Sequence, residues 1–174
     1  MTRDKIIQLA FIKLGEVHNR YNDNTSDQYR IASFLLDDII ENLAVDTTFL
    51  FNATTVELAK TIEERDELGR YRFHIPADFL NIIRSNVNID REGEYFLSTF
   101  GKIILTYCKD IEFIEYPKYL EKLLVAKLMV ELAKVYSTYS GSIGFATGME
   151  ISSIQEIMNL EGLANGGVDF YELV

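Results

Sequence analysis

The sequence predicts a mixed α+β protein. It should contain a four-helix bundle made from an N-terminal and a C-terminal helix pair, a small antiparallel β-sheet inserted between the pairs, and an extended C-terminal arm. Apolar residues recur at helical spacing before residue 46 and after residue 117, whereas the middle holds short segments rich in Thr, Val, Ile, Phe and Tyr. The predicted organisation is therefore a helical bundle (1–46 and 118–161), a β-rich insertion (47–117) and an arm (162–174).

Two helices are predicted in the N-terminal part. The first covers residues 2–14, because apolar residues such as Ile6, Ala10 and Leu14 share one face and Gly15 follows as a stop. Leu9 and Ile12 fall on the opposite side, which is more apolar surface than a lone surface helix shows. The second helix begins at a capping serine and runs from residue 26 to about 44. Its expected buried stripe is Ile31, Leu35, Leu36, Ile39, Ile40 and Leu43.

The middle of the chain is predicted to form an antiparallel sheet. Strands are expected near residues 54–59, 70–75, 82–89, 95–98, 103–107 and 111–116. Residues 100–102, with Gly101 at their centre, are typical of a hairpin turn. Residues 63–69 are predicted to form a charged loop between two strands that faces solvent.

A strong third helix is predicted over residues 118–139, but its charged side changes midway. Lys118, Glu121 and Lys122 share one face, whereas Lys127, Glu131 and Lys134 lie roughly opposite. The two halves must therefore pack against different neighbours. The simpler explanation is a central bundle helix. The alternative is that one half meets another subunit, which makes this second group, together with Leu9 and Ile12, candidates for a subunit interface.

The C-terminal part is predicted to hold a Gly, Ser and Thr loop at residues 140–148 and a short helix at 149–160 that ends at Gly162. Gly166 and Gly167 then form a joint before an apolar and acidic end. Residues 140–174 contain five acidic residues and no Lys or Arg. Half of the net charge of −10 therefore lies in this last stretch.

Composition excludes several classes of function. The chain has 17 Lys and Arg against 27 Asp and Glu, which argues against a surface built to bind phosphates. A single cysteine, Cys108, excludes an internal disulfide, and with only two histidines a zinc site is not expected. No apolar run approaches the roughly 20 residues of a membrane span, and residues 1–20 do not resemble a signal peptide. We expect no cofactor, no metal and no membrane partner.

Candidate catalytic groups are few. The phosphate-loop, dinucleotide, HExxH and CxxC motifs are absent, and residues 140–144 lack the first glycine of a nucleophile elbow. His74 could act as a base for Cys108, although a lone strand histidine is usually a packing residue. Asp37, Asp38 and Glu41 fall within one helical turn, as a site for a hard cation requires. We expect a solvated acidic face and no enzyme; a small divalent-metal hydrolase and a soluble regulatory binding module remain the alternatives.

Several segments, in order, resemble one protein family. They are Leu9-Ala10 with Leu14-Gly15-Glu16, the Phe49–Asn52 segment, Phe73-His74-Ile75-Pro76-Ala77-Asp78-Phe79-Leu80, Tyr116-Pro117 with the apolar helix after it, and the glycine loop. This series is similar to the head-to-tail adaptor proteins of tailed bacteriophages, especially the tail tubular A type of short-tailed phages. The likeness spans about residues 5–160. The chain departs from the family in lacking the tryptophan often found before the Phe-Asn pair and in carrying the charged insertion at residues 63–69.

The resemblance implies a structural virion protein, not an enzyme, made in the host cytoplasm and built into the head-tail junction. It implies a closed ring, commonly of twelve copies in that family, that docks beneath the portal protein and receives downstream tail proteins. Genomic DNA would pass through without specific binding, which suits an acidic chain. The end of the arm, with Val168, Phe170, Tyr171 and Leu173 as anchors, would dock on the portal or a neighbour.

Overall fold

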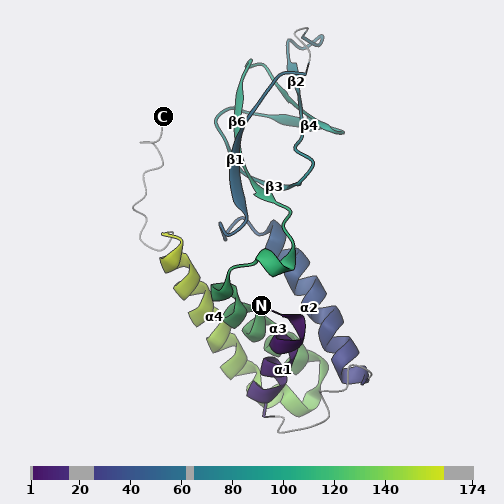
Figure 1. The fold of residues 1–174 in the computed structure, drawn as a ribbon, viewed down its shortest axis with the longest axis vertical. Coiled ribbons are helices and arrows are strands. Elements are labelled where there is room, and N and C mark those ends of the chain that lie inside the picture. The colour runs from purple at the N-terminus through teal and green to yellow at the C-terminus, as the bar shows by residue number, and fades with distance from the viewer. Residues whose placement is uncertain (1, 16–25, 62–64, 163–174) are drawn as a thin grey trace. The chain divides into compact units, whose positions relative to one another are not determined.

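The computed structural model describes residues 2–15, 26–61 and 65–162 and divides the chain into two compact units. One unit comprises Met1–Leu43 and Glu112–Val174, and the other comprises Ala44–Ile111. The first unit holds the helices and the second holds all the strands of the described residues (Figure 1). The predicted α+β class is confirmed.

The N-terminal helices begin and end where local chemistry favours it. Helix α1 covers Arg3–Lys13, and the side chain of Thr2 caps it by accepting a hydrogen bond from the backbone N–H of Lys5. Gly15 follows with a φ of +92°, a conformation that only glycine adopts at little cost. Helix α2 covers Asp27–Val45, and the hydroxyl of Ser26 accepts from the N–H of Tyr29.

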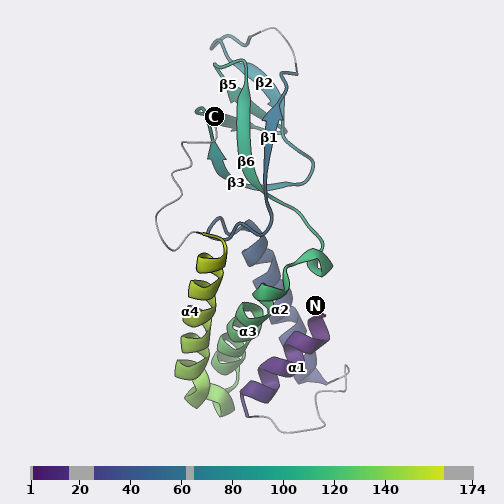
Figure 2. The ribbon, with the colours of Figure 1, turned by 60° about the vertical axis from the view of Figure 1, so that its left-hand side comes forward.

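Helix α3, Glu121–Val135, is the centre of the helical unit. It follows two short 3-10 turns, η1 (Phe113–Glu115) and η2 (Lys118–Leu120). Its side chains are buried around most of its circumference, with Leu123, Leu124 and Leu128 fully enclosed. Helices α1 and α4 both contact it and lie on its two sides (Figure 2). An ion pair of 2.8 Å between Arg3 and Asp37 joins α1 to α2.

The predicted loop at residues 140–148 is wrong. Helix α3 ends at Val135, a 3-10 segment η3 covers Ser137–Ser142, and helix α4 begins at once and spans Ile143–Leu160. Its first turns contain Gly144 and Gly148, which have low helix propensity, but Ala146 between them is fully buried. Tertiary packing therefore overrides the local preference. The predicted end of the helix is confirmed, since Gly162 has a φ of +75°.

The second unit contains two three-stranded antiparallel sheets instead of the single sheet expected. One sheet has the order β1-β6-β3, from Ala53–Leu58, Ile103–Lys109 and Phe79–Ser85. The other has the order β2-β5-β4, from Tyr71–His74, Tyr95–Ser98 and Asp90–Glu92. Three details of the prediction are corrected. Residues 82–89 are not one strand but the end of β3 and a connection. Residues 111–116 contain η1. Residues 100–102 link two sheets instead of forming a hairpin.

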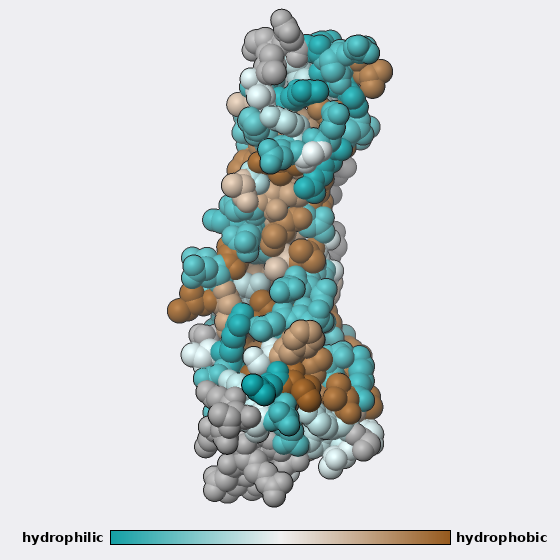
Figure 3. Space-filling model, turned by 90° about the vertical axis from the view of Figure 1, so that its right-hand side faces the viewer, coloured by the Kyte–Doolittle hydropathy of each residue, from teal (hydrophilic) through white to brown (hydrophobic). Residues whose placement is uncertain are grey.

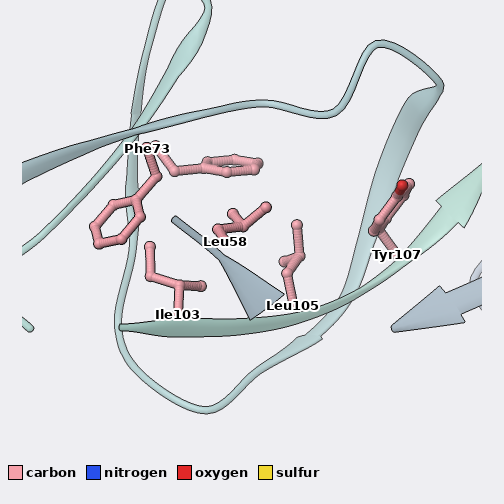
Figure 4. Packing of buried hydrophobic residues seen from close by; sticks show 6 residues of the cluster. Leu58, Phe73, Ile103, Leu105 and Tyr107 are labelled. Atoms are coloured by element: carbon pink, nitrogen blue, oxygen red, sulfur yellow. The ribbon is translucent and has the colours of Figure 1, made fainter. Parts of the chain in front are cut away.

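The two sheets share one apolar core. Strands β1 and β6 contribute Leu58, Ile103, Leu105 and Tyr107, and the other sheet contributes Phe73 (Figure 4). Phe96 of the other sheet belongs to the same core. The alternation of Ile103, Leu105 and Tyr107 places one face of β6 inward, as a half-buried strand requires. Phe79 of β3 meets Phe96 edge to face, with ring centroids 5.4 Å apart. The core therefore depends on aromatic contacts between the sheets.

Candidate functional site

The segments that carry the family resemblance have structural roles. Asn52 is buried and its Nδ2 donates to the carbonyls of Ala44, at 2.8 Å, and Lys109, at 3.0 Å. It therefore satisfies two backbone carbonyls within the second unit, those of Ala44 and Lys109. The carboxylate of Asp78 accepts a 2.8 Å hydrogen bond from the Tyr107 hydroxyl. Burial and this carboxylate raise the pKa of Tyr107 to about 12.

An open pocket of about 270 Å³ lies within the helical unit, between α1, η2, α3 and α4. Its apolar lining comes from Leu9, Val125 and Met149. Three lysines, Lys13, Lys118 and Lys122, and two glutamates, Glu121 and Glu156, surround it together with Tyr119. Small-molecule sites usually enclose about 300–1,000 Å³, so this pocket suits one or two side chains better than a metabolite.

The charges around the pocket are unequally paired. Glu121 binds Lys5 of α1 at 2.8 Å, and Lys122 binds Glu156 of α4 at 2.7 Å. Lys13 and Lys118 form no ion pair with any residue of the described ranges. The lining therefore holds three lysines against two glutamates in a chain whose net charge is −10, and Glu161 accepts a 2.7 Å hydrogen bond from the Tyr119 hydroxyl beside it.

Ion pairs also account for the change of charged face along α3. Lys127, on the second face, binds Glu150 of α4 at 2.9 Å in a largely buried pair. Glu131 and Lys134 pair with each other at 2.7 Å along the same helix. Charges on both sides of α3 thus meet α1 and α4, which is the arrangement of a central bundle helix. The role of Lys127, Glu131 and Lys134 in a subunit interface stays a prediction.

The outer face of α4 carries no charge. The helix holds two charged residues, Glu150 and Glu156, and both pair with lysines of α3. At 100° per residue, Gly144, Gly148 and Ser152 follow one another along its exposed side. Phe145 and Ile151 flank this line and are 57% and 53% exposed. We call these five residues the α4 face.

Other apolar side chains of the helical unit are also exposed. Phe34 of α2 is 75% exposed and stands beside Ile31, which was expected to be buried and is 38% exposed. Ile12 of α1 is 62% exposed, whereas Leu9 lines the pocket and is partly buried. Figure 3 looks onto the side where Figure 1 draws α2 and shows hydrophobic atoms among hydrophilic ones over this unit. Exposed apolar surface of this kind is typical of interaction sites.

The candidate catalytic groups are not brought together. Within the described residues no three His, Cys, Asp or Glu side chains are placed to share a metal, and Asp37 is engaged by Arg3 while Asp38 and Glu41 face solvent. His74 packs on Tyr95, at 4.8 Å between ring centroids, whereas Cys108 is buried in the other sheet. Burial and the nearby charge of Asp46 raise the pKa of the Cys108 thiol, the opposite of what a nucleophile needs.

The predicted docking residues of the arm, Val168, Phe170, Tyr171 and Leu173, lie outside the described residues. The pocket and the α4 face were not anticipated from the sequence. The signal for the α4 face is the spacing of Gly144, Gly148 and Ser152, four residues apart. The two glycines lie in the predicted loop at residues 140–148, whereas Ser152 lies in the predicted helix at 149–160, so the sequence does not group them.

None of the helices in the described parts of the chain combines the length and apolarity needed to cross a membrane. No model of a known protein family matches the chain. No curated protein matches it in sequence either.

Proposed function

We propose that this protein is a non-enzymatic, ring-forming connector of a bacteriophage virion, which docks beneath the portal and forms part of the DNA conduit to the tail. The observation that carries the proposal is the α4 face, an uncharged helix surface with the exposed apolar side chains Phe145 and Ile151, on a strongly acidic chain. The series of motifs described above supports the choice of family. Phage location, portal docking and the passage of DNA belong to this proposal.

The α4 face suits contact with a second copy for an electrostatic reason. Copies that each carry a net charge of −10 repel one another, and the repulsion is strongest where acidic side chains would be brought together. A face without charged side chains lets two copies meet without burying like charges. The glycines at positions 144 and 148 leave room for a neighbouring element, because no atom of the described residues lies within 4 Å of a Cβ built on either.

A closed ring requires a heterologous contact, in which two different surfaces of each copy meet. We therefore pair the α4 face of one copy with another apolar surface of the next. Phe34 of α2, with Ile31 beside it, is the candidate complement because it is the most exposed large apolar side chain among the described residues of the helical unit. Helices pack by placing side-chain ridges of one into grooves of the other, and the glycines of the α4 face make such a groove for the Phe34 ring.

The proposal is tested by the assembly of the full chain, alone and mixed with its portal protein, followed by light scattering and negative-stain imaging. The variant Ile151→Asp should remain folded, since the side chain is exposed, and should lose ring formation. Leu68→Asp, at an exposed apolar position of the other unit, is the matched control and should assemble normally. A chain that stays monomeric both alone and with the portal overturns the proposal.

A further inference from the structure

The pocket between α1, η2, α3 and α4 has a chemical character that the proposed connector role does not use. Its floor is apolar, from Leu9, Val125 and Met149, and its edge carries Lys13 and Lys118 without ion-pair partners among the described residues. Such a pocket selects a ligand with an apolar or aromatic group next to negative charge. Its volume of about 270 Å³ limits the buried part to one or two side chains.

The chain contains a segment with this composition. Residues 168–173 read Val-Asp-Phe-Tyr-Glu-Leu, so two aromatic residues stand between two carboxylates. No Lys or Arg occurs after residue 134. The segment therefore carries two negative charges and no positive one, and its composition complements the floor and the edge of the pocket.

The segment is attached close to the pocket. Helix α4 contributes Met149 and Glu156 to the lining, and Glu156 precedes Gly162 by six residues, roughly 9 Å along a helix axis. The seven residues between Gly162 and Phe170 span up to roughly 25 Å when extended. A tether of this length gives an effective concentration in the millimolar range, so that even weak complementarity suffices for binding.

We propose that the pocket binds residues 168–173 of the same chain, with an aromatic ring on the apolar floor and the carboxylates of Asp169 and Glu172 at Lys13 and Lys118. The pocket then holds the arm in the free protein, and docking of the arm on a portal requires its release. The binding itself does not depend on the proposed function, because it concerns the chain in the absence of any portal.

Zero-length carbodiimide coupling of the full chain tests this proposal, because it joins a carboxylate to an amine only where the two are in contact. Peptide mass spectrometry should find Asp169 or Glu172 linked to Lys13, Lys118 or Lys122. In a mixture of nitrogen-15-labelled and unlabelled chains, both peptides of each linked pair should be labelled or both unlabelled, because a link within one chain joins peptides of the same chain. The proposal is overturned if these links are absent or if they join two copies of the chain.

A charge swap separates specific binding from chance proximity. The double variant Lys13→Glu and Lys118→Glu should lose most of the links, by tenfold or more, while circular dichroism stays unchanged. Adding Asp169→Lys and Glu172→Lys places amines on the arm and leaves carboxylates at positions 13 and 118. Coupling between the arm and these two positions should then return. Lys109→Glu, an exposed lysine of the other unit, is the matched control and should leave the links intact. Links that persist in the double variant, or a swap that restores nothing, contradict the proposal.

Discussion

Replacing Gly148 by alanine should raise the stability of the single chain and weaken its assembly. Gly148 lies inside α4, and a Cβ at this position meets no atom within 4 Å in the part of the chain that the structure describes. Alanine is favoured over glycine in a helix interior by about 1 kcal/mol, because glycine loses more backbone entropy. For a chain of this size that gain corresponds to a rise in Tm of about 2–4 °C.

The effect on assembly should have the opposite sign. If a neighbouring copy packs into the groove at Gly148, the added methyl group overpacks the contact, at a cost of about 1–3 kcal/mol. A cost of that size weakens each interface by roughly 5- to 150-fold, since 1.4 kcal/mol is a factor of ten. The position therefore distinguishes a helix surface that is free in the assembly from one that is covered.

Two measurements test Gly148→Ala. Thermal unfolding at a concentration that keeps the protein monomeric should show the higher Tm, and light scattering over a dilution series should show the loss of assembly. Gly141→Ala is the control, because a Cβ there also meets no atom of the described chain within 4 Å but the residue lies in η3, outside the α4 face. A lower Tm would refute the helix argument, and unchanged assembly would refute the interface.

Three further outcomes are expected. Asn52→Asp should lower the free energy of unfolding by about 2–4 kcal/mol in urea titrations, because a buried carboxylate cannot donate to the two carbonyls that Asn52 binds; an unchanged midpoint would contradict this. Tyr107 has a folded pKa of about 12, against about 10 when unfolded, so it stabilises the fold up to pH 10 and loses this effect toward pH 12. Tyr107→Phe should flatten that decline in stability, and an equal decline in both proteins would be inconsistent with the assignment. Deleting residues 168–174 should leave circular dichroism unchanged and abolish attachment to the portal; normal docking would exclude the arm.

The parts of the fold that could be predicted are those fixed by local chemistry. Thr2 and Ser26 cap the helices that follow them, and Gly15 and Gly162 mark two helix ends, because these effects act within one turn of chain. The start of α4 could not be predicted in this way. Its glycines favour a loop, and the helix forms because the packing of α4 on α3, with Ala146, Ser153 and Ile157 buried, outweighs that preference.

Pairing between distant segments also escaped prediction. The alternating pattern of a strand predicts its inner and outer faces but not which strand pairs with it. The six strands were therefore predicted to form one sheet, whereas they form two sheets of three strands each. The pocket was missed for the same reason. Its apolar floor joins Leu9, Val125 and Met149, which come from three helices and are far apart in the sequence.

The most direct test of the connector proposal is an electron micrograph of the full chain mixed with its portal protein. The proposal predicts a closed ring of copies attached beneath the portal, with helix α4 of each copy in contact with the next. Particles in which the portal stays bare, and a chain that remains monomeric with and without it, would contradict the proposal.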